Sequence, residues 1–239
     1  MKFSLIIPCY NEAANLPLLL DRCKEVAHLP DVEVILVDNG STDNSPEILV
    51  SLLPQYSGCR SVRVEKNHGY GFGILTGLRA ASGDILGWTH ADMQTDPQDA
   101  LRGLNLVEKY GSNSFVKGRR YGRALGDVAF TVAMSFFETL LLAKPLWDIN
   151  AQPTMFSRQF FETWNEPPHD FSLDLYAYYQ ARLTELDVHR FPVLFGERAH
   201  GVSHWNVNWA AKRKFIRRTL NFSLQLRKSL KHETDYTSP

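Results

Sequence analysis

Apolar and polar positions follow two alternating periods along the first half of the chain. Short apolar runs, typical of buried strands, are separated by stretches in which apolar residues recur every three or four positions, as on a half-buried helix. The expected strands are residues 3–8, 32–37, 61–65 and 85–89, and the expected helices are residues 15–29, 45–53, 69–81 and 97–110. Strands that alternate with helices of this length favour βαβ units. The pattern predicts an α/β fold with a mostly parallel central sheet and helices on both faces.

The second half of the chain is less regular. It predicts strands at residues 115–118, 154–156 and 188–195, and helices at residues 128–143, 173–183 and 209–230. A basic turn at residues 119–123 is expected after the strand at 115–118. The sequence contains no internal repeat that would indicate a solenoid.

Composition narrows the class of partner. The 239 residues carry 26 Lys and Arg against 26 Asp and Glu, so the whole chain has no general attraction to nucleic acid. Three cysteines without zinc-ligand spacing fit a reducing, cytoplasmic compartment. The N-terminus runs into a strand pattern without a basic leader, so no secretory signal is expected.

Metal-capable side chains follow the strand at 85–89. His90, Asp92 and Gln94 would lie on one face if the segment stayed extended, at the end of a parallel strand where α/β proteins bind ligands. Carboxylate and amide oxygens suit Mg²⁺ or Mn²⁺, and an imidazole nitrogen suits Mn²⁺. Solvated polar residues at a strand edge are the alternative interpretation.

Two more polar loops are expected at the same sheet edge. Residues 8–12 follow the first strand and residues 38–43 follow the second. Asp38 could accept hydrogen bonds from a base or ribose, or it could simply form the turn, and Tyr10 could stack on a base. The glycines at 69–73 do not read G-x-G-x-x-G, and no G-x-x-x-x-G-K-[ST] occurs, which disfavours nicotinamide and ATPase sites.

Several motifs together resemble a known family. They are residues 7–12, 37–43, Asn67 with 69–77, 83–84 leading to 90–94, then 117–121, 191–193 and 198–204. In this order they resemble family 2 glycosyltransferases, which have the GT-A fold. The later motifs are most like the dolichyl-phosphate mannose synthase branch and its bacterial polyprenyl-phosphate relatives.

The resemblance implies a domain plan and residue roles. A GT-A domain would cover residues 1–205, with a nucleotide-sugar half at 1–118 and an acceptor half at 119–205, followed by a basic amphipathic helix and tail at 206–239. The nucleotide-sugar residues would be Pro8, Tyr10, Glu12, Asp38, Asn39, Ala91 and Asp92. Asp92 and Gln94, with His90 as a further candidate, would hold a divalent Mn²⁺ or Mg²⁺ ion. The residues for an acceptor or phosphate would be Lys117, Arg119, Arg120, Arg123 and Ser203. The catalytic set would be Asp92, Asp174, Arg119 and Arg198.

The chain departs from the branch at three places. His90 stands where the branch has Asp, Asn39 stands where it has a second Asp, and His204 follows Ser203 where it has Lys. The first two changes remove negative charge near the expected metal and nucleotide. They leave open a shifted metal preference, a different nucleotide or a weakened enzyme.

The expected function is inverting transfer of a sugar from a nucleotide-diphosphate sugar to a polyprenyl phosphate at the cytoplasmic face of a membrane. One alternative is transfer to a saccharide hydroxyl, with Asp174 as general base. Another is a non-catalytic nucleotide-sugar-binding homologue. The basic amphipathic segment 209–230 would contact anionic lipid, or would pack on the domain with its basic face in water. A homo-oligomer or a membrane-anchoring partner remains open.

Overall fold

The computed structural model describes residues 1–200, 213, 217 and 219–227. The chain divides into two compact units. The sheet unit comprises Met1–Arg123 and Asn150–Gly201, and the helical unit comprises Ala124–Ile149 and Val202–Pro239. Ser203 and half of the expected 209–230 helix lie outside the described residues.

A seven-stranded mixed sheet forms the centre of the sheet unit, in the order β3-β2-β1-β4-β6-β5-β7. The strands are β1 (Phe3–Cys9), β2 (Val32–Asn39), β3 (Cys59–Val64), β4 (Ile85–Trp88), β5 (Ser114–Tyr121), β6 (Thr154–Ser157) and β7 (Asp187–Leu194). β6 is antiparallel to both β4 and β5, and the other neighbouring pairs are parallel. The predicted α/β class with a mostly parallel sheet is confirmed.

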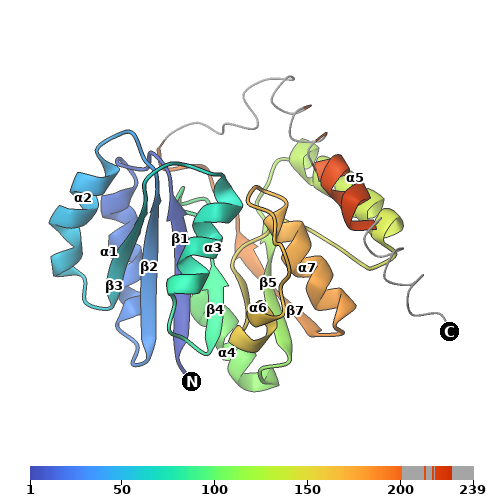
Figure 1. Cartoon of the computed structure of the whole chain (residues 1–239), viewed down its shortest axis with the longest axis horizontal. Helices are drawn as coiled ribbons and strands as arrows, with labels where there is room; N and C mark the ends of the chain where they lie inside the picture. The colour runs from blue at the N-terminus through green and yellow to red at the C-terminus, as the bar shows by residue number, and fades with distance from the viewer. Residues whose placement is uncertain (201–212, 214–216, 218, 228–239) are drawn as a thin grey trace. The chain divides into compact units, whose positions relative to one another are not determined.

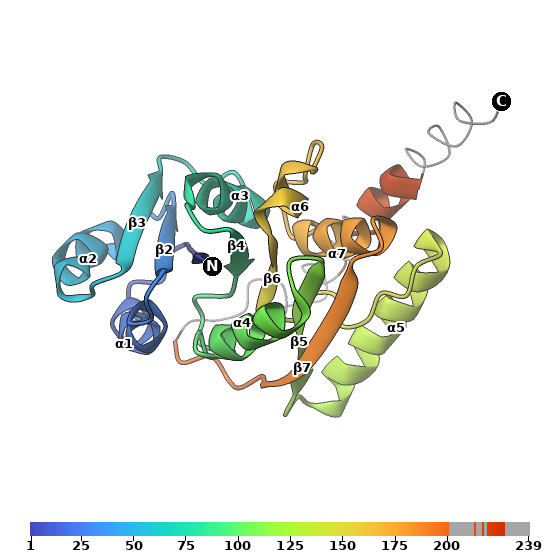
Figure 2. The ribbon, with the colours of Figure 1, turned by 90° about the horizontal axis from the view of Figure 1, so that it is seen from below.

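Helices cover both faces of this sheet (Figures 1 and 2). On one face lie α1 (Leu16–Ala27) and α4 (Asp99–Tyr110), and α2 (Ser45–Leu52), followed by the 3₁₀ turn Leu53–Gln55, packs beside α1. On the other face lie α3 (Tyr70–Ala80), α6 (Arg158–Glu162) and α7 (Leu173–Leu183). The layer between the sheet and helices α1 and α4 has an apolar centre, whereas the layer on the α7 side also buries Lys117 and Asp174.

The two core layers have different compositions. The α1 and α4 side is aliphatic, with Leu5, Ile7, Leu19 and Val107 fully buried. The α6 and α7 side is aromatic, where rings pack mostly edge to face or offset at centroid separations of 5.3–6.5 Å. These rings belong to Trp88, Phe115, Phe156, Phe160, Trp164, Tyr176 and Tyr178. Bulky rings therefore fill the core between the sheet and helices α6 and α7.

The structure corrects three local predictions. β5 continues to Tyr121, paired with Leu194 of β7, so Arg119 and Arg120 lie in a strand rather than in a turn. β4 ends at Trp88, and Met93 has a φ of 61°. The segment from His90 to Gln94 is therefore bent, and its three polar residues do not share one strand face. Helix α6, which the sequence pattern did not predict, starts where the Ser157 hydroxyl accepts from the Phe160 amide.

The helical unit contains α5 (Leu125–Leu142), and residues 213, 217 and 219–227 are also helical. α5 buries only Ser135, Glu138 and Leu142. Its exposed large apolar side chains are Leu125, Val128, Val132, Phe136, Phe137 and Leu140. Among the described residues α5 is the one helix long and apolar enough to cross a membrane by length and composition, with 17% of it buried.

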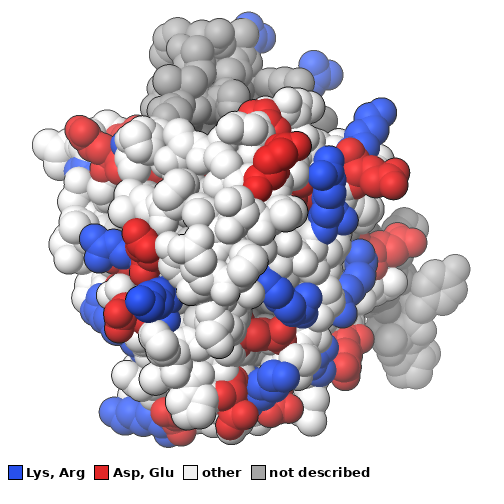
Figure 3. Space-filling model, turned by 90° about the vertical axis from the view of Figure 1, so that its left-hand side faces the viewer, with Lys and Arg blue, Asp and Glu red and all other residues white. Residues whose placement is uncertain are grey.

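Charges on the face drawn in Figure 3 are mixed. Acidic and basic side chains alternate over its described surface rather than gathering by sign. A surface of this kind does not steer a strongly charged partner.

Glu33 ties four segments together at the amino-terminal end of the first strands. Its Oε1 accepts from Ser4 Oγ at 2.7 Å and from the Ser82 amide at 2.7 Å, and its Oε2 accepts from Arg60 Nε at 3.0 Å. Burial alone would raise the pKa of Glu33, but the hydrogen bonds from Ser82, Ser4 and Arg60 lower it to about 2. The charged carboxylate therefore stabilises the folded state.

We predict that Glu33→Ala lowers the free energy of unfolding at neutral pH by about 2 kcal/mol, because several donors lose a charged acceptor. The folded pKa is depressed, so this contribution is complete above pH 4.5 and is lost as the pH falls toward about 2. Urea unfolding of both proteins across this range measures it. The control is Glu25→Ala, on the exposed surface of α1. If the difference in unfolding free energy between Glu33→Ala and the unsubstituted chain does not shrink on acidification, the stabilising role assigned to the Glu33 carboxylate is wrong.

Candidate active site

Strand direction brings the polar loops to one edge of the sheet. β1, β2, β3 and β4 are parallel, and β5 and β7 share their direction because β6 runs against both β4 and β5. The carboxyl ends of six strands and the amino end of β6 therefore meet at the same edge. This is where open α/β sheets bind ligands.

Hydrogen bonds connect the loops after β1 and β2. Asn11 Oδ1 accepts from the Thr42 amide at 2.8 Å, Ser41 Oγ accepts from the Asn11 amide at 3.0 Å, and Ser45 Oγ accepts from the Glu12 amide at 3.0 Å. These bonds fix the predicted nucleoside loops relative to one another. Tyr10 is left 39% exposed at the rim, where a base could stack on its ring.

Asp38 is buried at the end of β2. Its Oδ1 accepts from the Ser41 amide at 3.0 Å, and its Oδ2 lies 3.6 Å from Arg63 Nε without a hydrogen bond. The turn-forming and ligand-binding interpretations of Asp38 are thus compatible, because one oxygen closes the turn and the other keeps a free acceptor position.

Asn39 has a role that Asp could not fill. Its Nδ2 donates to the Gly69 carbonyl at 2.9 Å, at the start of α3, while its Oδ1 is buried with no hydrogen-bond partner among the described residues. Gly73 leaves room for this amide, since a Cβ there would lie 2.9 Å from Asn39 Cγ. The departure at Asn39 therefore couples the second strand to the first turn of α3.

Asp92 forms the most closely paired charge of the site. Its side chain is 9% exposed, and its Oδ2 lies 2.8 Å from Arg198 Nη2. Its Oδ1 accepts from the Gln94 amide at 3.1 Å, which closes the bend at Met93. Arg198 Nε is buried with no hydrogen-bond partner in the described part of the chain.

Gln94 holds the segment that carries Arg198. The Gly196 amide donates to the Gln94 carbonyl at 2.8 Å, and Gln94 Nε2 donates to the Gly196 carbonyl at 3.2 Å. The predicted metal ligand thus has its amide nitrogen engaged with residues 195–200, which we call the strap. Gln94 Oε1 is the atom left to serve as a ligand.

Glu12 adds a second carboxyl group near this pair. Burial is the largest influence and raises the pKa of Glu12, the hydrogen bond from Asn15 lowers it, and the charges of Asp92 and Arg198 act in opposite directions. Burial and the nearby Asp92 charge thus favour the neutral form of Glu12 more than in a free side chain.

His90 faces α3 and forms part of an aromatic stack. Its ring lies 5.6 Å from that of Tyr70, which in turn stacks on Phe171 at 4.5 Å with an interplanar angle of 10°. Burial lowers the pKa of His90, so the imidazole is neutral at physiological pH. Burial and the charges of Asp174 and Asp92 raise the pKa of Tyr70, which keeps its hydroxyl protonated.

Asp174 lies beneath the site in a hydrogen-bonded network. It is 1% exposed, and its Oδ1 accepts from Gln152 Nε2 at 2.6 Å and from Trp88 Nε1 at 3.3 Å. Lys117 Nζ lies 4.0 Å from the same oxygen and donates to the Ala151 carbonyl and the Thr154 hydroxyl, both at 2.7 Å. Lys117 is fully buried, so the structure places it inside the protein rather than at a surface that an acceptor reaches.

The remaining basic candidates lie at the carboxyl end of β5. Arg119 is exposed, and the guanidinium carbons of Arg120 and Arg123 lie 5.1 Å and 5.6 Å from the centroid of the Phe195 ring. Both guanidinium groups therefore pack against the start of the strap. Ala91 is buried between the Trp88 end of β4 and Asp92, and Pro8 lies half-buried in β1.

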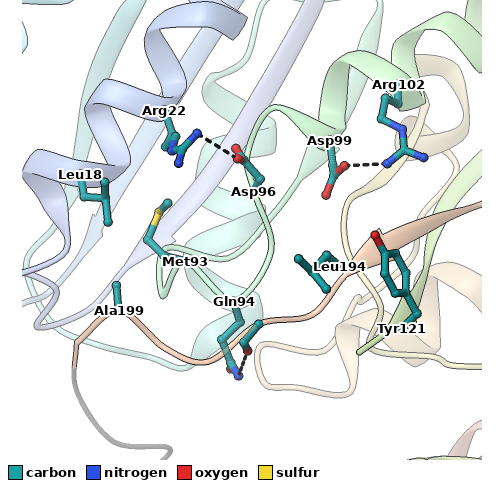
Figure 4. Close-up of a pocket in the computed structure, with 11 residues that line it drawn as sticks. Leu18, Arg22, Met93, Gln94, Asp96, Asp99, Arg102, Tyr121, Leu194 and Ala199 are labelled. Carbon is teal, nitrogen blue, oxygen red and sulfur yellow. Dashed lines mark hydrogen bonds and ion pairs between the residues drawn. The ribbon is translucent and has the colours of Figure 1, made fainter. Parts of the chain in front are cut away.

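A pocket of about 450 Å³ lies behind the loop that carries Asp92 (Figure 4). Its charges are paired within its own walls: Arg22 Nη1 lies 3.5 Å from Asp96 Oδ2, and Arg102 Nη1 lies 3.0 Å from Asp99 Oδ1. The rest of its lining comes from Leu18, Met93, Gln94, Tyr121, Leu194, Gly196 and Ala199. Met93 and Gln94, which follow Asp92 in the chain, thus line this pocket.

The donor set fits a divalent cation only in part. Among the described residues no group of three or more His, Cys, Asp and Glu side chains could hold a metal by itself. Asp92 and Gln94 Oε1 supply hard oxygen atoms, which fits a cation that takes most of its ligands from a bound diphosphate and water.

Three residues of the site were missing from the sequence interpretation. Trp88 and Gln152 hold Asp174, and Tyr70 stacks on His90. Gln152 lies in the polar turn before β6, which was a visible signal. Trp88 and Tyr70 read as core aromatics, and only tertiary packing shows where they lie.

Comparison with known proteins gives the class of this fold and site. The sequence profile of Glycosyl transferase family 2 matches residues 4–223, and the chain belongs to that family. It is 36% identical over 113 residues to an undecaprenyl-phosphate 4-deoxy-4-formamido-L-arabinose transferase from Serratia proteamaculans, covering 45% of this chain and 34% of that protein. A namesake from Yersinia enterocolitica is 35% identical over 111 residues, with the same coverage. The chain thus spans about a third of the length of these relatives.

Solved structures confirm the GT-A fold. Glucosyl-3-phosphoglycerate synthase from Mycobacterium tuberculosis in complex with UDP superposes with a TM-score of 0.72 at 19% identity, covering 95% of this chain and 80% of that one. A mannosyltransferase from Pyrobaculum calidifontis in complex with GDP-Man and Mn²⁺ has a TM-score of 0.63 at 21% identity, covering 84% and 58%.

We predict that Asn39→Asp lowers the free energy of unfolding at neutral pH by about 2 kcal/mol, because a buried carboxylate would face the Gly69 carbonyl. The new carboxyl has a raised pKa in the folded chain, so its charge penalty relative to the parent shrinks as the pH falls from that raised value toward about 4, and it is lost below about 4, where the folded and unfolded chains are both protonated. Urea unfolding at several pH values measures this difference.

Asn67→Asp is the matched control. Asn67 Oδ1 accepts from the Gly69 amide at 2.8 Å, so a carboxylate keeps this contact. Equal destabilisation by the two substitutions would contradict the role assigned to the Asn39 amide.

Proposed function

We propose that this protein transfers a sugar, with inversion, from a nucleotide-diphosphate sugar to a polyprenyl phosphate. The observation that carries the proposal is the pair of Asp92 and Arg198 at the edge where the nucleoside loops meet, one group suited to a metal and the other to a phosphate. Family membership supports the reaction class, and the names of the undecaprenyl-phosphate relatives support the acceptor class.

Separate residues would bind the base, the ribose and the diphosphate of the donor. Tyr10 would stack on the base while Asp38 Oδ2 accepts from the ribose or base, and the hydrogen-bonded loops hold both in position. Asp92 and Gln94, with His90 as a further candidate, would hold Mn²⁺ or Mg²⁺. When bound, the metal would stabilise negative charge on the diphosphate leaving group.

The state of Asp174 favours an acceptor that is already anionic. A hydroxyl acceptor needs a base within hydrogen-bond reach. Asp174 is 1% exposed, and its Oδ1 accepts from Trp88 and Gln152, so it acts as a positioning residue beneath the site. A phosphate acceptor needs no base, and Arg119, Arg120 and Arg123 at the end of β5 would grip its oxygens.

A lipid acceptor agrees with the exposed surface of α5. Phe136 is 57% exposed and Leu140 67% exposed, on a helix that buries only three of its residues. An apolar helix surface of this kind suits the headgroup boundary of a bilayer, and basic residues of the 209–230 segment would add attraction to anionic lipid. Peripheral attachment at the cytoplasmic face of a membrane follows as part of the proposal.

We predict that Asp92→Asn lowers the rate of transfer by at least about 100-fold, the scale for removing one group that stabilises transition-state charge. The assay follows radiolabelled sugar from UDP- and GDP-sugars into undecaprenyl phosphate in detergent. Asp96→Asn is the matched control, because Asp96 lies in the same loop but faces the pocket with Arg22. Tight nucleotide binding with no turnover by the parent chain would instead support a non-catalytic binding protein, and turnover on saccharide hydroxyls alone would overturn the acceptor.

We predict that Leu140→Gln lowers binding to vesicles containing anionic phosphatidylglycerol by about 30-fold, because a leucine loses about 2 kcal/mol of burial. Flotation of the chain with such vesicles measures the bound fraction. Val50→Gln is the matched control, since Val50 is 75% exposed on α2. Equal vesicle binding by both variants and the parent chain would show that α5 does not contribute to membrane binding.

A further inference from the structure

Arg198 occupies the place of a cation beside Asp92. The carboxylate is 9% exposed and the guanidinium 24% exposed, with 2.8 Å between Oδ2 and Nη2. A carboxylate this deeply buried needs a positive partner, and among the described residues Arg198 is the ion-pair partner that it has. The metal expected at Asp92 and the guanidinium therefore compete for the same oxygen.

Arg198 also has a donor atom that forms no hydrogen bond within the described residues. Its Nε is buried and has no hydrogen-bond partner among the described residues, although a guanidinium offers five donors in a fork that matches phosphate oxygens. The strap is fixed at Phe195, whose amide donates to the Tyr121 carbonyl, and at Gly196 by Gln94. Arg198 lies two residues beyond these anchors, so its side chain can change partners while the strap stays in place.

We propose that Arg198 is an exchangeable counter-ion of Asp92. Before the donor binds, Arg198 neutralises the buried carboxylate. When a divalent cation arrives with a nucleoside diphosphate, the cation takes Asp92 and Arg198 turns to the diphosphate, so no charge is left unpaired. The inference rests on the proposed function, because it takes the ligand to be a metal-bound nucleoside diphosphate.

The exchange makes the two ligands depend on each other. A metal ion that binds alone must displace Arg198 without offering it an anion, and a diphosphate that binds alone meets an arginine already paired with Asp92. Each ligand therefore raises the affinity for the other by the same factor. An arginine that only binds phosphate would strengthen diphosphate binding and leave Mn²⁺ alone unaffected.

The test measures free Mn²⁺ by electron paramagnetic resonance during titration of the full chain, with and without UDP, GDP or ADP. Titrations without protein correct for Mn²⁺ bound to nucleotide in solution. For the parent chain we expect at least about tenfold tighter Mn²⁺ binding when the matching nucleotide is present, within the usual range for coupled sites. For Arg198→Gln we expect Mn²⁺ alone to bind about tenfold more tightly than to the parent, and the effect of nucleotide to be largely lost.

Two variants separate this exchange from a general charge effect. Arg22→Gln removes a positive charge from α1, where Arg22 pairs with Asp96 in the pocket of Figure 4. This variant should bind Mn²⁺ as the parent does. Arg198→Lys keeps the charge beside Asp92 and should bind Mn²⁺ alone as weakly as the parent. Circular dichroism melts establish that each variant is folded.

The outcomes distinguish failure of the exchange from failure of the proposed function. If the parent binds Mn²⁺ with nucleotide but shows no coupling, or if folded Arg198→Gln binds Mn²⁺ alone no more tightly than the parent, the exchange is wrong and the proposed function stands. If the parent binds no Mn²⁺ with any of the nucleotides, the proposed function fails and the exchange fails with it.

Discussion

The direction of β6 is the constraint on which the site depends. Because this short strand runs against both β4 and β5, the strands on either side of it share one direction, and their carboxyl ends meet at one edge. The same reversal brings the turn before β6 to that edge, and with it Gln152, which holds Asp174. A parallel β6 would carry this turn to the opposite end of the sheet. The nucleoside loops and the Asp92 loop are neighbours because β1, β2 and β4 are parallel, and the strap joins them because β7 has the same direction.

Around that edge the protein holds polar atoms that its own chain does not satisfy. Asn39 Oδ1, Gln152 Oε1 and Arg198 Nε are all buried without a hydrogen-bond partner among the described residues. Buried polar groups are usually paired, because an unpaired one loses hydration without compensation. Asn39 and Gln152 lie at strand ends of the candidate site and Arg198 lies in the strap, where a bound ligand would supply the missing partners.

The sequence predicted the elements that periodicity controls. α7 begins and ends where its apolar spacing indicated, and the loops after β1, β2 and β4 meet as the alternation of strands and helices required. The bend at Met93 was not predictable, since Met93 takes a left-handed conformation that no glycine signals. Lys117 looked like a phosphate ligand because its charge is visible in the sequence, while the Ala151 carbonyl that accepts its hydrogen bond is visible only in the fold.

Long-range pairs explain the departures from the family pattern better than local chemistry does. Asn39 is an amide because it must donate to Gly69, and His90 is neutral because it is buried against Tyr70. With both positions uncharged, Asp92 is the principal negative charge, and the charge of Arg198 already balances it. A site balanced in this way has little spare charge to attract a divalent ion by itself. Under the proposed function, the diphosphate would supply the negative charge that such an ion requires, in agreement with an arginine that changes partners at Asp92.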